Sequence, residues 1–482
     1  MRGPTPINLP LSQLGEGMSE RTGLVRRLTS GQVAMIGLSG ALGTGLFLGS
    51  GATIALAGPA TIISYILAGS LALVIVWALA EMVSVHPVPG GHGAVAGAYL
   101  GRLGGYVGRW NFAIQSFIAV GAEVVAGATY LQHWFPGLNL GVGTVCCSLF
   151  VIGLNLATVR LYGTSEYWFS MIKVVAICAF ILLGLSLIFF GWPSPNPPTG
   201  LSNLTSHRGF APYGFGGILL AACMAVFSFG GIENSSAGAA ESEHPERDIP
   251  RAARAMIWRL LIFYILAVGV IVTMQPWTET AAANGTIESS PFVKALDAAG
   301  ISAAGHIMNF VLIVAALSAA NGCLYASSRM IHSLAIDGMA PKAAAKTSHN
   351  GAPRGAVMIA AIGMVIASLL SIFAAESAFQ YLMGAAILGI LVTWTIVLLT
   401  HLRFRSVRKK LGKPAAPARV LGAPYVNYLG IAACVCVFIA LWWQIHAAWV
   451  AGIPYLICLF GSYFVLKHFR DLPEPKELPE GH

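Results

Sequence analysis

The chain has 482 residues, of which 56% are hydrophobic and only 10% are charged, and its formal net charge is +9. A soluble protein of this length could not cover its surface with so few ionic groups, so the composition excludes that class and indicates a membrane protein. Apolar stretches of about 20 residues recur along the chain between short charged segments, which predicts an all-α fold of membrane-spanning helices.

Twelve spans are expected in chain order. They lie near residues 33–56, 60–84, 106–132, 142–160, 168–191, 216–240, 257–275, 304–334, 356–374, 379–401, 425–446 and 449–467. Because this number is even, both termini are expected on the same side of the membrane. Residues 1–30 precede the first span as a polar arm, and residues 468–482 follow the last span as a polar tail.

The basic residues predict which side that is. The arm contains Arg26 and Arg27, and alternate loops carry the group from Arg247 to Arg259 and the run from Arg403 to Arg419. The opposite loops contain only Arg208 and Lys294. By the positive-inside rule, the arm, the tail and the basic loops are cytoplasmic, which predicts a multi-pass protein of the cytoplasmic (inner) membrane. The net charge therefore reflects topology, and we expect no nucleic-acid partner.

Two spans contain sequence that opposes a continuous helix. The first is dense in glycine from Gly37 to Gly51, and each glycine lowers helix stability by about 1 kcal/mol relative to alanine. The sixth has the pair Gly230-Gly231, followed at once by the polar run from Glu233 to Ser236. These interruptions are five spans apart, which fits two copies of opposite orientation whose broken helices meet near the midplane. Close packing of helices at small residues is the alternative explanation.

Breaks at these positions would expose backbone amides and carbonyls, and a substrate can supply their missing hydrogen-bond partners. Span 1 is expected to end its inner half near Ser39 with free carbonyls and to restart near Gly43 with free amides, while span 6 ends its outer half near Phe227. Carbonyl ends favour a cation and amide ends favour an anion, so the pair describes a cradle for a zwitterion. The expected substrate-binding residues are Ser39, Gly40, Ala41, Gly43, Thr44, Gly45, Glu123, Phe227, Ser228, Phe229, Gly230 and Gly231.

Several longer motifs resemble a known family. They are the glycine-rich run from Gly40 to Gly51, the segment Glu166-Tyr-Trp-Phe-Ser-Met-Ile-Lys173, the segment Phe229-Gly-Gly-Ile-Glu233, the segment from Glu241 to Arg251, and Ser327-Ser-Arg329-Met. In this order they resemble bacterial amino acid permeases of the amino acid–polyamine–organocation superfamily. The resemblance covers roughly residues 20–465. Two departures from the family pattern are Asn234-Ser-Ser236 and the loop Gly90-Gly-His92-Gly93.

The resemblance implies a five-plus-five inverted-repeat fold and uptake coupled to protons. The first repeat would cover residues 31–191 and the second residues 216–401, joined by the extracytoplasmic loop 192–215, with two extra spans in 402–467. By motif position, Thr44 and its flanking glycines correspond to carboxylate-binding residues. The carbonyls of Ala41, Phe227 and Gly230 correspond to ammonium ligands.

Three ionisable residues, Glu123, Lys173 and Glu233, lie within the predicted spans, where a charge is costly. The resemblance assigns Lys173 to proton coupling, although spacing alone would let it extend to the interface. Glu233 either caps the inner half-helix of span 6 or takes part in proton coupling. Glu123 either contacts substrate or is a buried hydrogen-bonded group. Glu81 is expected to be a loop or interface residue.

Taken together, these features predict a secondary active transporter that imports amino acids by proton symport. An exchanger or a sodium-coupled transporter of the same fold is the alternative within transport. A polytopic membrane enzyme is the alternative from another class, but the sequence has no Gly-x-Ser-x-Gly, no His-Glu-x-x-His and no phosphate-binding loop. We expect a neutral amino acid as substrate, the proton as coupling ion, and no other cofactor or metal.

Overall fold

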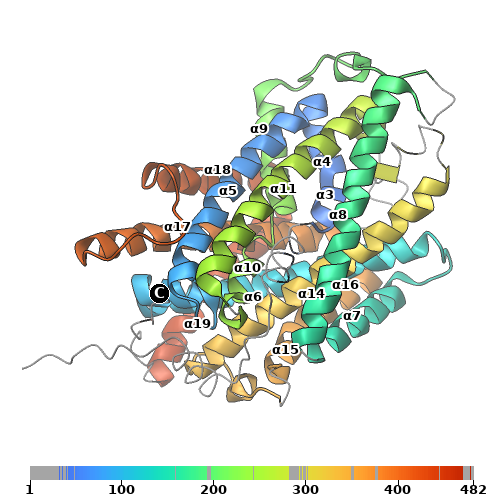
Figure 1. Cartoon of the computed structure of the whole chain (residues 1–482). Coiled ribbons are helices and arrows are strands. Elements are labelled where there is room, and N and C mark those ends of the chain that lie inside the picture. The colour runs from blue at the N-terminus through green and yellow to red at the C-terminus, as the bar shows by residue number, and fades with distance from the viewer. Residues whose placement is uncertain are drawn as a thin grey trace, which may run out of the picture.

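The structure is a computed structural model (Figure 1). It describes residues 42–47, 49–157, 159–192, 197–242, 244–281, 302–348, 352–374, 378–444 and 446–470, and the isolated residues Gln32, Met35, Gly40, Phe292, Val293, Leu296, Gly300 and Leu478. Within these residues every assigned element is a helix.

The helices follow one another with short connections. The longer ones are α4 (Gly49–Ala57), α5 (Thr61–Val85), α6 (Gly91–Gln132), α7 (Leu140–Leu156), α8 (Val159–Phe190), α9 (Gly214–Ser228), α11 (Pro245–Met274), α14 (Ser302–Ile336), α16 (Ile362–Phe373), α17 (Ala378–Lys410), α18 (Tyr425–Gln444) and α19 (His446–Phe469). Shorter ones are α3 (Thr44–Phe47), α10 (Asn234–Ala237), α12 (Trp277–Ala281) and α15 (Arg354–Ala360).

Many of these helices are long and apolar enough to cross a bilayer. Over the described part of the chain, nine segments meet both criteria: Gly45–Val85, Gly91–Gln132, Leu161–Phe190, Pro245–Met274, Gly305–Ile336, Arg354–Phe373, Tyr381–Lys410, Tyr425–Trp443 and Gly452–Phe469. The helices α7 and α9 are apolar but shorter. The prediction of an all-helical, multi-pass membrane protein is therefore confirmed, while the number of twelve spans stays a prediction.

Two helices begin earlier than the hydrophobic pattern predicted. α6 begins at Gly91 instead of near residue 106, because the helical path continues across a kink at Gly101, whose φ is +84°. α8 begins at Val159 instead of near residue 168. Arg109 in α6 and Glu166 in α8 are both buried. The expectation of three ionisable residues within the spans was therefore too low: Glu166 lies where α8 extends beyond its predicted span, and Arg109 lies within the predicted span 106–132 itself.

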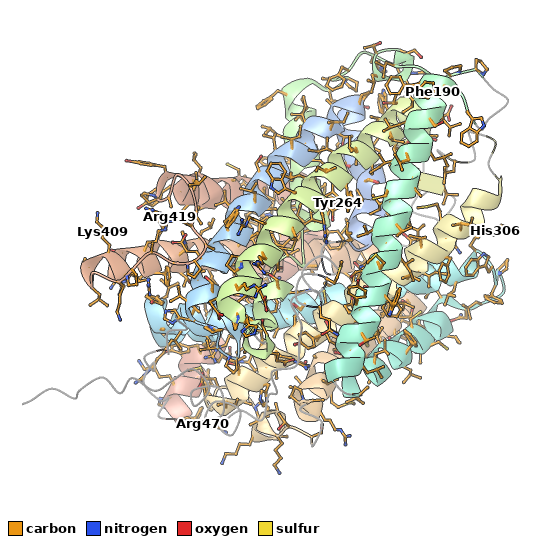
Figure 2. The ribbon with its side chains drawn as sticks, viewed as in Figure 1. Phe190, Tyr264, His306, Lys409, Arg419 and Arg470 are labelled. Atoms are coloured by element: carbon orange, nitrogen blue, oxygen red, sulfur yellow. The ribbon has the colours of Figure 1, made fainter. Side chains whose placement is uncertain are left out.

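The longest helices pack in contacting pairs. α5 lies beside α11, α6 beside α14, and α8 contacts both α11 and α14 (Figure 1). Large apolar side chains cover the outward faces; Phe190, for example, is 78% exposed. Phe190 lies at one end of the molecule and the basic Arg470 at the opposite end (Figure 2). An outside covered by apolar side chains is the surface that a lipid-embedded helical bundle requires.

Candidate functional site

The chain is interrupted between α9 and α10, at the Gly-Gly pair where the sequence predicted a break. α9 ends at Ser228, and the amide of Gly230 then donates to the carbonyl of Phe227 at 3.0 Å, in a tighter turn than an α-helix makes. Gly231 has a φ of +96°, which side chains with a Cβ rarely permit. A second turn, closed by a hydrogen bond of 3.0 Å from the amide of Asn234 to the carbonyl of Gly231, leads into α10.

A second interruption lies in the first predicted span. Leu42 and Gly43 form a bend, and α3 begins directly after it at Thr44. Gly40, before the bend, is again helical. Two residues predicted to bind substrate here, Ser39 and Ala41, lie outside the described residues, and so does the side chain of Thr44.

The two interruptions touch each other through backbone atoms. A Cβ added to Gly40 would lie 2.7 Å from the carbonyl oxygen of Gly231, and one added to Gly231 would lie 2.4 Å from the carbonyl oxygen of Gly40. A Cβ on Gly45 would lie 2.7 Å from the Cα of Ser228. The hydroxyl of Ser228 also donates to the carbonyl of Gly45 at 2.8 Å. Side chains at the three glycines would force the segments apart, which explains the glycine content of both breaks.

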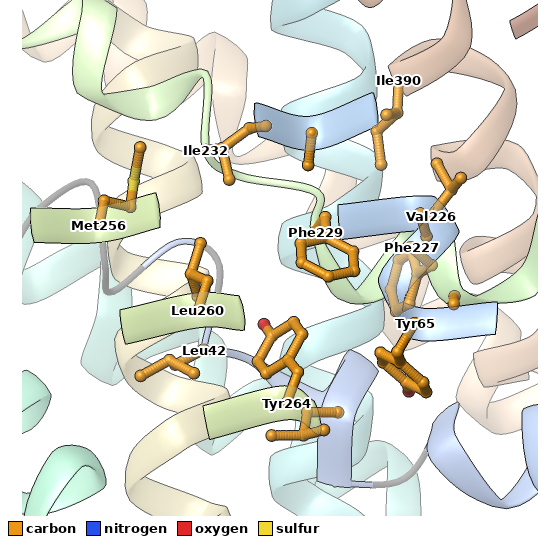
Figure 3. Close-up of a cluster of buried hydrophobic side chains, with 14 of the residues drawn as sticks. Leu42, Tyr65, Val226, Phe227, Phe229, Ile232, Met256, Leu260, Tyr264 and Ile390 are labelled. Atoms are coloured by element: carbon orange, nitrogen blue, oxygen red, sulfur yellow. The ribbon is translucent and has the colours of Figure 1, made fainter. Parts of the chain in front are cut away.

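Two tyrosines brace this contact from one side (Figure 3). Tyr264 from α11 donates its hydroxyl to the carbonyl of Ser228 at 2.6 Å, and the hydroxyl of Tyr65 from α5 lies 3.2 Å from the Ser228 hydroxyl. Because that serine donates to Gly45, Tyr65 is the donor in this pair. The last carbonyl of α9 therefore has a partner, although it lies at a helix end buried in the molecule.

A cavity lies beside the two interruptions. Its empty volume is about 450 Å³, including the part open to solvent. We call it the central cavity, and it is lined by Gly40, Gly43, Gly45, Gln115, Ser116, Ala119, Glu123, Phe227, Gly230, Gly231, Glu233, Asn234, Cys323, Ala386 and Ile390. Both interrupted segments thus contribute to the wall of one cavity, together with α6, α14 and α17.

Most of the described substrate-binding candidates line this cavity, but two do not. The ring of Phe229 packs between Tyr65 and Tyr264, with ring centroids 4.8 Å apart for Phe229 and Tyr264, so it belongs to the apolar cluster of Figure 3. The side chain of Ser228 bridges the two interruptions instead of facing the cavity. Phe227, two residues before Phe229, forms the aromatic part of the wall.

Two carboxylates belong to the cavity wall. Glu123 faces Gly43 so closely that a Cβ there would lie 2.6 Å from its Oε1. Glu233 accepts a hydrogen bond of 2.7 Å from Gln115 and one of 3.4 Å from the Trp394 indole. It precedes α10, for which no side-chain capping hydrogen bond is present, and the choice between a capping and a coupling role stays a prediction.

Lys173 is fully buried in α8 and does not extend to an interface. Its ammonium donates to the hydroxyl of Ser318 at 3.0 Å, and this hydroxyl in turn donates to the carboxylate of Glu166. The other oxygen of Glu166 accepts from Asn321 at 2.6 Å, and Asn321 accepts from Asn155 at 2.7 Å. The network links α7, α8 and α14 around one lysine, so the alternative of an interfacial Lys173 was wrong.

Glu81 also differs from its expected position. It is 4% exposed at the end of α5, where Arg405 donates to both of its oxygens at 2.8 and 2.7 Å and the amide of Val420 donates at 2.7 Å. His401 lies 3.1 Å away. Glu81 therefore joins α5 to α17 and to the segment after α17 instead of lying in a loop.

Several cavity residues were not predicted from the sequence. Gln115 and Ser116 lie in α6, Cys323 in α14, and Ala386 and Ile390 in α17. These helices are regular at those positions, so no local break in the pattern distinguishes the residues from ordinary core. The one available signal was that Gln115 and Ser116 have polar side chains although they lie in an apolar stretch.

Known proteins with similar sequences are amino acid transporters. The family model described as "Amino acid permease" matches residues 32–465. The "Probable threonine/serine transporter YbxG" of Bacillus subtilis (strain 168) is 34% identical over 444 residues, which are 92% of this chain and 95% of that protein. The "Aromatic amino acid transport protein AroP" of Escherichia coli (strain K12) is 36% identical over 397 residues, 82% of this chain and 85% of that protein.

Proposed function

The chain belongs to the amino acid permease family, and from this premise we propose that it imports amino acids across the cytoplasmic membrane by proton symport with alternating access. The central cavity is the substrate site, and the two interrupted helices form its polar cradle. One observation carries the proposal most directly: the two interruptions, far apart in sequence, touch at Gly40 and Gly231 beside that cavity.

The packing of the helices supports twelve spans in a five-plus-five inverted repeat. The helices of the first four spans each contact the helix five spans later: α4 contacts α9, α5 contacts α11, α6 contacts α14, and α7 contacts α16. Two copies related by a pseudo-two-fold axis in the membrane plane would pair in this way. Spans 11 and 12 correspond to α18 and α19.

The helix ends in the cavity suit a zwitterion. The carboxyl end of α9 presents the carbonyls of Phe227 and Gly230, and the former retains a lone pair after accepting one amide. At Thr44, where α3 begins, the backbone presents amides. The helix macrodipole makes the first end favourable for an ammonium group and the second for a carboxylate. A bound α-amino acid would satisfy both ends at once.

Lys173 is our candidate for proton coupling. Ser170, one turn before it in α8, donates its hydroxyl to the carbonyl of Met35 in the first predicted span at 3.3 Å, so α8 borders that span. A charged Lys173 would hold span 1 on α8, and loss of its proton would weaken that hold. Glu233, buried beside the cavity, is the second candidate.

The orientation follows from the basic loops and stays part of the proposal. The end of α17, where Arg408, Lys409 and Lys410 cluster, would face the cytoplasm together with both termini. Protons and amino acids would then enter from the opposite side. A neutral amino acid is the proposed substrate, and no nucleic acid takes part.

Uptake by purified protein in proteoliposomes tests this function. An imposed inward proton gradient should drive accumulation of a labelled amino acid, and dissipating the gradient should abolish accumulation. Accumulation that needs a sodium gradient instead would contradict proton symport, and gradient-independent counterflow would indicate an exchanger. No flux of any amino acid under any of these conditions would overturn the proposed function.

A further inference from the structure

The polar groups of the central cavity differ in how well the protein satisfies them. The carboxamide of Gln115 is engaged at both ends, because it donates to Glu233 at 2.7 Å and accepts from the Thr393 hydroxyl at 2.6 Å. Glu233 has two donors, Gln115 and Trp394. The protein therefore already supplies hydrogen-bond partners to both residues.

Within the described part of the chain, Ser116 and Asn234 have hydrogen-bonding capacity left. Ser116 is 3% exposed and lines the cavity, and no described residue forms a hydrogen bond with its hydroxyl. Asn234 is 1% exposed, and its side chain forms one hydrogen bond with the described residues, a donation of 3.5 Å to the Cys323 sulfur, which is a weak acceptor. A buried hydroxyl or amide without a good partner is costly, so both groups favour a ligand that supplies one.

The rest of the wall is apolar. Ala119, Ala386 and Ile390 provide apolar surface, and Phe227 provides an aromatic ring. The glycine side lies close to Asn234, since a Cβ on Gly40 would lie 2.6 Å from its amide nitrogen. Ser116 and Asn234 therefore stand as polar groups between apolar parts of the wall.

The position of Asn234 is fixed from outside the cavity. Ser236, on the same short helix α10, donates its hydroxyl to the carbonyl of Glu233 at 2.8 Å, and Nδ1 of His92 lies 2.7 Å from that hydroxyl. Because the serine proton is used on Glu233, His92 must be the donor in this second bond. A Cβ on Gly91 would lie 2.4 Å from the Ser236 carbonyl oxygen. The segment Gly90–Gly93 and the segment Asn234–Ser236, the two departures from the family pattern, are thus in contact. This contact holds α10 in place.

From this arrangement we infer that the site selects amino acids with a neutral side chain that carries a hydroxyl or carboxamide, and that Ser116 and Asn234 are the residues that determine this specificity. The inference rests on the proposed function and names the substrate class of the same site. A site built to hydrogen-bond a polar substrate group discriminates strongly against an analogue of equal shape that lacks the group.

Pairs of amino acids with the same shape give the sharpest test. Unlabelled threonine should compete for uptake at least tenfold better than valine, and asparagine at least tenfold better than leucine, because each pair differs mainly by hydrogen-bonding groups. Equal competition within both pairs, or strongest competition by phenylalanine, would overturn the inference while leaving amino acid transport intact. Absence of all uptake would instead count against the proposed function.

Two variants test whether Ser116 and Asn234 cause the preference for threonine over valine and for asparagine over leucine. Ser116→Ala and Asn234→Ala should each reduce the threonine-to-valine or asparagine-to-leucine preference by about tenfold. Ser148→Ala is the matched control, since Ser148 is a buried serine of α7 that donates within its own helix and does not line the cavity. Unchanged preferences in both variants would overturn the assignment. Should either variant fail to fold, the wild-type preferences still decide the substrate class.

Discussion

Gly231→Ala is the substitution that most directly strains the contact between the two interrupted helices. At a φ of +96°, alanine costs about 1–3 kcal/mol in backbone strain. Its Cβ would lie 2.4 Å from the oxygen and 2.5 Å from the carbon of the Gly40 carbonyl, and backbone atoms cannot rotate away. Overpacking of this kind costs about 1–3 kcal/mol more. The combined cost of about 2–6 kcal/mol is enough to separate the segments.

We expect the affinity for substrate in Gly231→Ala to fall at least tenfold, measured as the KM of uptake in proteoliposomes and as the Kd of the detergent-solubilised protein. Gly49→Ala is the control, because Gly49 lies in the same predicted span as Gly40 and a Cβ there meets no atom within 4 Å. Gly230→Ala should have a smaller effect, since its Cβ would mainly meet Cδ1 of Ile390, the end of a flexible side chain. A folded Gly231→Ala protein with wild-type KM and Kd would refute the close contact.

Three further predictions concern residues around the site. Lys173→Ala should remove the dependence of uptake on the proton gradient while substrate counterflow persists; gradient-driven accumulation in the folded variant would rule out its coupling role. His92→Ala and Ser236→Ala should both raise KM about tenfold with a smaller change in Vmax, because each frees α10 from α6; a loss of Vmax alone would contradict this. Arg405→Gln should destabilise the protein by about 1–3 kcal/mol in unfolding measurements, since the buried Glu81 loses two hydrogen bonds, whereas the exposed Arg403→Gln should be neutral.

The sequence predicted the helices well because the bilayer imposes a simple rule. Each apolar stretch has to satisfy its own backbone, so hydropathy identifies helices, and glycine density identifies where they break. The start of α6 was missed because Gly101 changes direction without ending the helical path. Which phenylalanine faces the cavity could not be predicted either, since the rotation of the chain at the break decides between Phe227 and Phe229.

Contacts between segments that are distant in the sequence could not be predicted from it. Glu81 and Arg405 are 324 residues apart, and nothing local to Glu81 indicates that partner. The same holds for Lys173, whose hydroxyl partner Ser318 is 145 residues away. Ser116 lies in a regular part of α6, so its exposure to the cavity depends on how α6 packs against α10 and α14. Such residues become visible once the fold brings the helices together.

An experimental density map of the protein with a bound amino acid tests the central claim most directly. We expect the ligand between the segment from Gly40 to Gly45 and the segment from Phe227 to Gly231, with its carboxylate at the start of α3 and its ammonium group at the end of α9. A density map that shows spans 1 and 6 as continuous helices would contradict the account. So would a ligand that is bound away from both segments.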